Sequence, residues 1–346
     1  MMRKTIATIA ALCATVLVAA CGGQSTPPAG SGDGAKSTIQ LRLPVAAPTS
    51  ATTPIFVGAE KGFFAEEGFQ TSYVTVASAA AMVPAITAGQ IDVMTASLST
   101  EIGMRQAGQD VQVISGYTIG QNYFVFVRNG VNIPANGTFE EKMKALNGLR
   151  IGAQGGAEGT VVPLLKAVMK AGGGDPATLQ FANMAFGGPQ IAGLQGSQVD
   201  VVLADDATVS TGTNLGIGTS VFSLLKDSPP EYTGLLGSGV AALSSTLTKY
   251  PDFNERYFRA MDKTFKWMQD PANMDEIVKI ATTVQGLPNT PDLPKRLAAF
   301  VPTLSAGNDK TTVQRSLDFL FESGQVKPEP EVTVDQFFNP VMVMSG

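Results

Sequence analysis

Polar and glycine-rich loops follow the predicted strands where each strand ends, and these loops hold the residues that could bind a small molecule. We expect the ligand-binding site to comprise Pro48, Thr49, Ser50, Ser78, Ala79, Ser97 and Tyr117 in the first half, and Gln154, Gly156, Glu158, Thr160, Phe186 and Asp205 in the second. Helices beginning at Ser78 and Thr160 would present free amide N–H groups, which bind carboxylate, sulfonate or nitrate oxygens. Two alternatives stay open: Ser78 also suits a plain N-cap, and the glycines of residues 155–159 also suit a flexible turn.

The charges in and near these loops are negative. Four carboxylates lie there, Glu101, Glu158, Asp205 and Asp206, whereas none of the loops contains lysine or arginine. An anion bound there would have to rely on N–H and hydroxyl donors beside carboxylates that repel it. The ligand is therefore neutral, zwitterionic or amine-bearing, unless the carboxylates face water at the rim of the site or Arg128 supplies a cation.

Histidine is absent from the 346 residues, and its absence excludes several kinds of chemistry. Ser-His-Asp and Cys-His catalysis, His-ligated zinc and a histidine proton shuttle all need an imidazole. The glycines of residues 155–159 spell neither nucleotide-binding fingerprint. The formal charge is −5 and no run of basic residues occurs, which argues against nucleic-acid binding. Carboxylate, lysine or tyrosine chemistry stays possible, but we expect a binding protein without enzyme activity, metal or cofactor.

Short apolar strands alternate with helix-length segments along most of the chain. Strands are expected at residues 38–46, 69–76, 91–96, 111–115, 123–128, 149–153, 179–185, 199–204 and 235–243. Helices are expected at residues 54–67, 78–89, 160–171, 189–195, 253–268 and 274–284, with another ending at Gly108. This alternation predicts an α/β fold with mostly parallel, doubly wound sheets, whose carboxyl ends carry the binding loops.

Two passages look alike across the halves of the chain. Residues 86–93 and 194–201 both end a helix near a glycine and then open a buried strand with Gln-Ile-Asp-Val or Gln-Val-Asp-Val. Aligned on Gly89 and Gly196, the second passage has one extra residue. Such a match is either a coincidence of turn chemistry or an indication of two similar lobes.

The last third of the chain is mainly helical. An apolar stripe runs along residues 253–268 at helical spacing, comprising Phe253, Tyr257, Met261, Phe265 and Met268. We interpret this stripe as core packing. The ending is predicted to be a helix at residues 317–321 and an extended tail at residues 332–338 that covers the first lobe.

The N-terminus has the pattern of an export signal. A basic head, Arg3-Lys4, precedes an apolar stretch that ends in Val18-Ala19-Ala20-Cys21. The residues before Cys21 resemble a bacterial lipobox, which implies lipidation of Cys21. Residues 1–20 would then be removed together with Cys13, leaving no disulfide and no catalytic thiol. The Gly/Ser/Pro-rich residues 21–37 are expected to form a flexible tether between the membrane and the body.

The chain resembles the solute-binding proteins of ABC importers for nitrate, sulfonates, taurine and thiamine-pyrimidine precursors. The resemblance rests on residues 54–69, a helix that ends in Lys-Gly-Phe-Phe and the following residues just before a strand, and on residues 89–92, 149–152 and 319–324. It implies the type II periplasmic-binding-protein fold, in which two lobes joined by two crossover strands hold the ligand between them. The first lobe would comprise residues 38–117 and 232–346, and the second residues 118–231.

The resemblance also implies the function and the partners. The chain would be a monomeric, lipid-anchored extracytoplasmic protein that delivers a small organic solute to an ABC permease and its ATPase. Two alternatives stay open: a sensor that signals to a membrane receptor, and a pyrimidine- or menaquinone-pathway enzyme on the same fold. Relatives that synthesise the thiamine pyrimidine use a histidine and porphobilinogen-polymerising relatives use a cysteine, neither of which the mature chain would contain.

Overall fold

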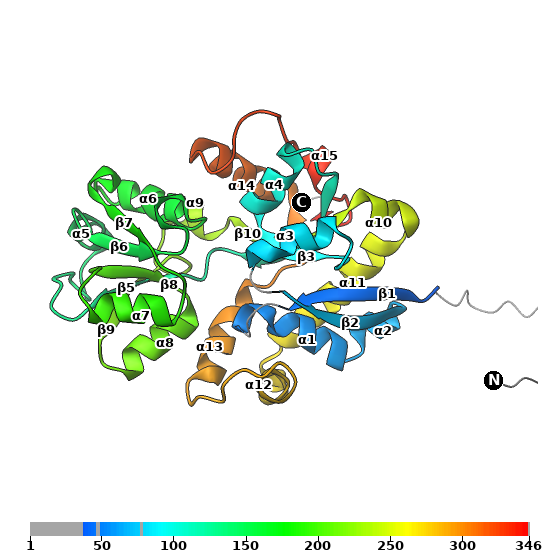
Figure 1. The fold of residues 1–346 in the computed structure, drawn as a ribbon, viewed down its shortest axis with the longest axis horizontal. Helices are drawn as coiled ribbons and strands as arrows, with labels where there is room; N and C mark the ends of the chain where they lie inside the picture. The colour runs from blue at the N-terminus through cyan, green and yellow to red at the C-terminus, as the bar shows by residue number, and fades with distance from the viewer. Residues whose placement is uncertain (1–36, 46–48, 77–78, 345–346) are drawn as a thin grey trace, which may run out of the picture. The chain divides into compact units, whose positions relative to one another are not determined.

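The computed structural model describes residues 37–45, 49–76 and 79–344. The predicted signal peptide, Cys21, most of the tether, Pro48 and Ser78 lie outside the described residues. Residues 37–346 form one unit, whose main strands fall into two groups, one in each lobe (Figure 1). No helix among the described residues has the length and apolar character needed to cross a membrane.

The first lobe holds two small sheets. β1 (Ile39–Val45) and β2 (Phe69–Thr75) pair in parallel. In the other sheet, β10 (Leu236–Leu243) lies between β3 (Met94–Ser97) and β4 (Val111–Ile119) and runs antiparallel to both. The helices near these strands are α1 (Thr53–Glu60), α2 (Phe63–Glu66), α3 (Ala79–Thr87), α4 (Leu98–Gln106), α10 (Ser244–Lys249) and α11 (Phe253–Gln269).

The second lobe is built on one five-stranded sheet. Its strands are β5 (Phe124–Arg128), β6 (Arg150–Ala153), β7 (Gln180–Asn183), β8 (Val201–Ala204) and β9 (Gly218–Ser223). Their order is β7-β6-β8-β5-β9. β6 runs parallel to its neighbours β7 and β8, whereas β5 runs antiparallel to its neighbours β8 and β9. α5 (Phe139–Ala145) and α6 (Val162–Ala171) cover one face, and α7 (Gly188–Gln195) and α8 (Asp206–Asn214) the other (Figure 1).

The chain passes between the two groups of strands twice, from β4 to β5 and from β9 to β10. The predicted two-lobed α/β fold is therefore confirmed. Strands β5 and β10 depart from the parallel pattern, because each enters its sheet from the other lobe. No helix lies in the described residues 120–123 between β4 and β5, and only the one-turn helix α9 (Pro230–Thr233) lies between β9 and β10.

The two similar sequence passages form the same local structure. Asp92 accepts hydrogen bonds from the backbone N–H and Nε of Arg42, at 2.7 and 2.9 Å. Asp200 accepts the equivalent pair from Arg150, at 3.1 and 3.0 Å. In both lobes an aspartate at the start of one strand thus binds an arginine of the neighbouring strand, which supports the interpretation as two similar lobes.

The alignment with one extra residue is wrong. Gly89 and Ser197 have positive φ, 65° and 52°, and each is the left-handed residue that ends its helix. The next residues, Gln90 and Gln198, donate backbone hydrogen bonds five residues back in both cases. The passages therefore match without an insertion, and Ser197 rather than Gly196 stands where Gly89 stands.

The apolar stripe of α11 is core, as predicted. Its five stripe residues are all buried in the hydrophobic cluster that also contains the inward side chains of β1 and α1. α12 (Met274–Thr283) contributes Ile277, Ile280 and Ala281 to the same cluster. α13 (Leu293–Phe300) extends it through Leu293, Leu297 and Phe300.

Other predictions need correction. The helix expected at residues 54–67 is divided into α1 and α2, because Gly62 takes a left-handed conformation with φ of 73°. The tail expected to be extended at residues 332–338 contains α15 (Val334–Phe337), although it does pack on the first lobe. α14 (Lys310–Glu322) is longer than expected. Four further elements, α5, α8, β9 and α13, have no counterpart among the helices and strands expected from the sequence.

Candidate functional site

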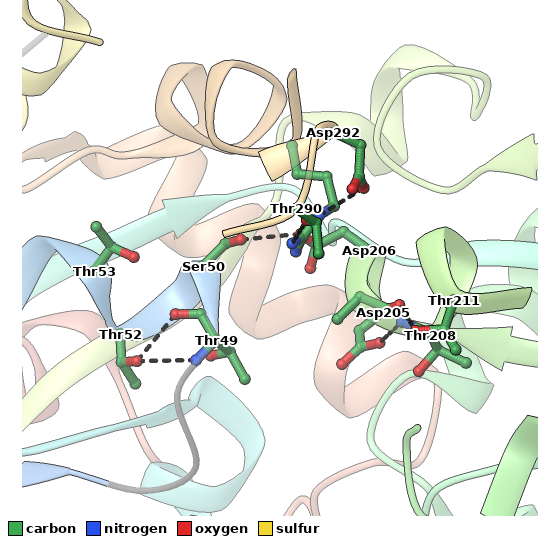
Figure 2. Close-up of polar contacts among 12 residues, drawn as sticks. Thr49, Ser50, Thr52, Thr53, Asp205, Asp206, Thr208, Thr211, Thr290 and Asp292 are labelled. Carbon is green, nitrogen blue, oxygen red and sulfur yellow. Dashed lines mark hydrogen bonds and ion pairs between the residues drawn. The ribbon is translucent and has the colours of Figure 1, made fainter. Parts of the chain in front are cut away.

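Ser50, in the loop that follows β1 of the first lobe, contacts the second lobe. It lies just after β1, begins a short 3-10 turn over Ser50–Thr52 and is 2% exposed. Its Oγ donates a hydrogen bond to Oδ2 of Asp206 at 3.0 Å (Figure 2). The backbone carbonyl of the neighbouring Thr49 accepts a hydrogen bond from Nε2 of Gln285 at 2.7 Å, which holds this loop in place.

Two consecutive aspartates, Asp205 and Asp206, directly follow β8 in the second lobe and make different contacts. Asp205 is the N-cap of α8, where its Oδ1 accepts the backbone N–H of Thr208 at 2.8 Å. Burial raises the pKa of Asp205 above its ordinary value, and the hydrogen bonds from Thr208 only partly oppose this. Asp206 points instead toward Ser50, as Figure 2 shows.

Arg296 supplies a cation to this position. From α13 in the first lobe, its Nη1 donates to Oδ2 of Asp206 at 3.1 Å and its Nε donates to Oδ2 of Asp292 at 3.0 Å. The Arg296 side chain is only 13% exposed. A charged group this well buried is tolerated because it is paired and hydrogen-bonded.

Asp292 pairs with Arg296 within the first lobe, and its Oδ1 has no hydrogen-bond partner of normal geometry among the described residues. Burial raises its pKa, but the nearby hydroxyls of Ser210 on α8 and of Thr290, together with the charge of Arg296, outweigh burial and leave the pKa below its ordinary value. We call the group Ser50, Asp205, Asp206, Asp292 and Arg296 the strand-end junction. It is where the two lobes meet at the ends of β1 and β8.

An aromatic pair lies beside the junction. Tyr123, just before β5, stacks on Phe186, which follows β7, with ring centroids 5.6 Å apart and planes 22° from parallel. Burial, together with the charges of Asp205 and Asp206, raises the pKa of Tyr123 to about 12. Tyr123 is therefore a neutral phenol at physiological pH, and its ring packs on that of Phe186.

A groove of about 480 Å³ runs between the lobes on another side of the interface. Its first-lobe wall is formed by Ser99 at the start of α4 and by residues 319 and 322–325 at the end of α14. Its second-lobe wall is formed by residues 157–160 and by the face of α6 that carries Lys166 and Lys170. This volume lies within the range of small-molecule sites, which is about 300–1,000 Å³. We call it the interlobe groove.

Comparison with known proteins places the chain in a family. The sequence model described as NMT1/THI5 like matches residues 49–273, which is more than half of the chain. The chain belongs to the NMT1/THI5-like family. No curated protein matches it.

Solved structures with low sequence identity share the fold of this NMT1/THI5-like chain. The alkanesulfonate-binding protein SsuA from Xanthomonas axonopodis pv. citri, bound to MOPS, is 16% identical, with 90% of this chain and 100% of that chain covered and a TM-score of 0.66. The periplasmic aliphatic sulphonate binding protein SsuA from Escherichia coli is 15% identical, with 87% and 97% covered and a TM-score of 0.65. The periplasmic nitrate-binding protein NrtA from Synechocystis PCC 6803 is 12% identical, with 87% and 86% covered and a TM-score of 0.67.

The predicted site residues of this NMT1/THI5-like chain fall into several places. Thr49, Ser50 and Asp205 lie at or beside the strand-end junction, and Phe186 is in the aromatic pair. Glu158 and Thr160 line the interlobe groove. Gln154 is exposed and, with Thr160 and Phe186, lines a small hollow in the second lobe that is about 10 Å³, the size of one water molecule. Gly156 is buried in the adjoining turn.

The remaining predicted residues have roles within one lobe. Ser97 is the N-cap of α4, and its Oγ accepts the backbone N–H of Thr100 at 3.3 Å. Ala79 begins α3. Tyr117 was expected at the ligand but is 2% exposed in the first-lobe core, where its hydroxyl donates to the carbonyl of Ala51 at 2.5 Å. The strand predicted to end at residue 115 continues to Ile119, so Tyr117 lies within β4 in a run of buried positions and its ring is part of the core.

Two charged residues also need correction. Glu101 does not face the site: it is 0% exposed on α4 and lies against β10. Arg128 cannot supply the cation, because its Nη2 pairs with Asp200 at 3.0 Å at the opposite end of β8 from Asp205. The cation that the structure does bring to the strand-end junction is Arg296, which sequence reasoning missed. The only signal was the spacing of Asp292 and Arg296, which suits an ion pair on a helix.

The described residues contain no group of three or more cysteine, aspartate or glutamate side chains placed to hold a metal ion. The junction aspartates are instead committed to the N-cap of α8, to Ser50 and to Arg296. The geometry therefore supports reversible binding between two lobes by hydrogen bonds and stacking.

Proposed function

We propose that the chain is the extracytoplasmic solute-binding component of an ABC importer, which captures a small organic solute between its lobes and delivers it to a permease. The observation that carries this proposal is the interlobe groove, a space of small-molecule size with walls from both lobes. Membership of the NMT1/THI5-like family and the fold shared with sulfonate- and nitrate-binding proteins support it.

Because the groove has walls on both lobes, binding of a solute should be coupled to movement of the lobes. A solute that touches both lobes makes all its contacts only when the lobes are close together. It therefore shifts the balance between lobe arrangements by its difference in affinity for them. A permease that recognises the closed arrangement could in this way distinguish loaded from empty protein. We propose the residues 38–117 and 232–346 as one moving body and residues 118–231 as the other.

The test begins with a thermal-shift screen of the purified protein over sulfonates, nitrate, aromatic carboxylates, pyrimidines and amines. A solute that raises the unfolding temperature is then titrated by calorimetry, and X-ray scattering measures the particle with and without it. We expect saturable binding and a smaller radius of gyration with solute. A panel that leaves the unfolding temperature unchanged throughout counts against the proposal.

Paired substitutions test whether both lobes contact the solute. Ser99→Ala on the first lobe and Thr160→Ala on the second should each weaken binding about fivefold, which corresponds to the roughly 1 kcal/mol of one lost hydrogen bond. Ser245→Ala and Thr248→Ala on α10 are matched controls outside the groove and should leave the affinity unchanged. Unchanged affinity in both groove variants would remove the groove as the site.

We also propose that the solute is released chemically intact. The chain has no histidine to act as a general base. The hydroxyl of Ser50 does donate to the carboxylate of Asp206, but Ser50 is 2% exposed and is therefore shielded from a solute. Mass spectrometry of a bound solute after long incubation should return it unaltered. Product in molar excess over protein would instead establish turnover.

Finally, we propose that a lipid on Cys21 anchors a monomeric protein on the outer side of the cell membrane. Cys21→Ser should move the protein from the membrane fraction to the soluble fraction without changing solute affinity. Cys13→Ser, within the predicted signal peptide, is the matched control and should leave the protein in the membrane fraction. Retention of the Cys21 variant in membranes would contradict the anchor.

A further inference from the structure

Asp206 joins the two lobes at a distance from the chain crossovers. We take the crossover segments as residues 118–123 and 224–238, where the chain passes between the lobes. Among the described residues, the interlobe side-chain hydrogen bonds of normal geometry with neither partner in these segments both end on Oδ2 of Asp206, in α8 of the second lobe. From the first lobe, Ser50 donates one at 3.0 Å and Arg296 donates the other at 3.1 Å. A single carboxylate therefore receives both contacts.

Apolar packing does not bind the lobes to each other as it binds each lobe internally. In every hydrophobic cluster of the described structure, the buried members come from one lobe only. Moving the lobes apart would therefore open no hydrophobic core, which is the largest favourable term within a folded domain. The arrangement of the lobes is left to polar contacts, to the crossover segments and to the partly buried side chains at the interface.

The ion pair of Asp206 with Arg296 is strong enough to matter and weak enough to be reversible. Their side chains are 15% and 13% exposed, so water and salt screen the attraction less than at an open surface. If the lobes separated, Arg296 would keep its bond to Asp292, which belongs to the same lobe. Asp206 would lose both partners but regain water, which offsets part of the loss.

We propose that Asp206 is a positioning residue, which holds the second lobe against Ser50 and Arg296 and keeps the lobes joined before any solute binds. Asp206 does not line the interlobe groove, so its effect on binding would be indirect. The groove has walls on both lobes, and a binding arrangement that is only partly populated lowers the apparent affinity by that fraction. This consequence for affinity rests on the proposed solute-binding function, whereas the joining of the lobes does not.

The test measures the radius of gyration of the solute-free protein by X-ray scattering. Asp206→Ala removes the carboxylate, and Arg296→Met removes the guanidinium but keeps an apolar stem. Each substitution should lower the ratio of joined to separated protein about tenfold, the effect of losing a close charge pair across an interface, and so enlarge the radius of gyration. The double variant should be enlarged no more than Asp206→Ala alone, because both substitutions break the same contact.

Matched controls remove ion pairs that lie within the first lobe. Arg259 pairs with Glu67 at 2.8 Å, and Asp335 pairs with Lys310 at 2.9 Å. Arg259→Met and Asp335→Ala therefore change the net charge as the two test substitutions do, but should leave the radius of gyration unchanged. Arg296→Lys keeps the charge and should stay closer to wild type than Arg296→Met. Circular dichroism confirms that each variant is folded, and the two test substitutions lie in different lobes, so one remains if the other does not fold.

The outcomes separate this inference from the proposed function. An unchanged radius of gyration in the folded test variants overturns the inference, and so does an equal enlargement in the controls. Additive enlargement in the double variant also overturns it, because independent effects cannot come from one shared contact. If the variants expand but no solute of the screen binds wild type, the role of Asp206 stands and the proposed function fails. If a solute binds but neither variant expands, the reverse holds.

Discussion

Glu101 allows a pH-dependent prediction with a defined sign. Its side chain is 0% exposed on α4, and within the described part of the chain neither carboxylate oxygen has a hydrogen-bond partner of normal geometry. Burial raises the pKa of Glu101 well above its ordinary value, and the backbone N–H of Ala96 opposes only part of the rise. The folded protein therefore keeps this carboxyl group protonated at pH values where the unfolded chain has already released the proton.

The consequence for stability follows from proton linkage. Below an unfolded-state pKa of about 4.3, both states hold the proton and Glu101 adds no pH dependence. Above it, unfolding releases a proton, so each further pH unit lowers the free energy of unfolding by about 1.4 kcal/mol. The loss stops where the pH passes the folded-state pKa of Glu101, because the folded protein then releases the proton too.

Glu101→Gln removes the titrating group while keeping the size of the side chain. The variant should be close to wild type near pH 4 and increasingly more stable than wild type as the pH rises, by about 1.4 kcal/mol per unit up to a plateau. The pH of that plateau reports the folded-state pKa. With an unfolding entropy of about 2.1 cal/mol/K per residue, each kcal/mol corresponds to a rise of roughly 1.5 °C in the unfolding temperature of a folded unit that spans residues 37–346.

The assay is thermal and urea unfolding of both proteins between pH 4 and pH 8, monitored by circular dichroism. Glu322→Gln, at an exposed position at the end of α14, is the matched control and should differ from wild type by less than about 0.5 kcal/mol throughout. A Glu101→Gln difference that stays constant with pH would refute the reasoning, because it would mean that Glu101 is ionised in the folded protein.

Three further predictions concern the two similar lobes and the crossover strand. Hydrogen bonds from two arginines hold the pKa of Asp200 well below its ordinary value, whereas Asp92 pairs with one arginine. In urea unfolding at pH 7, Asp200→Asn should therefore lower the free energy of unfolding by about 2 kcal/mol, and Asp92→Asn by about half as much. The Asp200→Asn deficit should shrink below about pH 4, where protonation removes the same stabilisation from wild type. Gly116→Ala should lower the free energy of unfolding by about 2 kcal/mol, because the new Cβ would stand 2.5 Å from a backbone carbonyl oxygen. Gly103→Ala, at an unobstructed position on α4, should raise it by up to about 1 kcal/mol. Equal effects of the two substitutions in thermal unfolding would contradict this account of the packing. Ser197→Gly should raise stability by about 1 kcal/mol, since its φ of 52° costs a residue with a side chain about that much; a destabilised variant would show that the serine side chain is needed there.

Local signals in the sequence were enough for the fold class and most elements. Strands such as residues 38–46 and the stripe of α11 follow from periodicity, because burial of one face imposes a repeat that can be read directly. Where the signal was weak, the prediction failed. α13 is only eight residues long and follows a loop rich in proline, so its apolar repeat of Leu293, Leu297 and Phe300 is too short to stand out. The break at Gly62 depends on one left-handed residue.

Likewise, the loops that follow the strands were predictable, because the carboxyl ends of parallel strands meet at one edge of a sheet. Ser50 and Asp205 do follow their strands to the strand-end junction, and Phe186 lies in the aromatic pair beside it. Sequence position does not determine which way a side chain at such an end points. Tyr117 and Glu101 both turned inward to the core, where burial of their large side chains was decided by neighbouring strands.

The electrostatic character of the site was decided only by the tertiary structure. The sequence determined that the strand-end loops carry carboxylates and no basic residue. It contained no indication that Arg296, 90 residues from Asp206, would reach the junction from a different element. A charge interacts through space with whatever the fold places within a few ångströms, so the charge of a site is a property of packing rather than of any one segment of the chain.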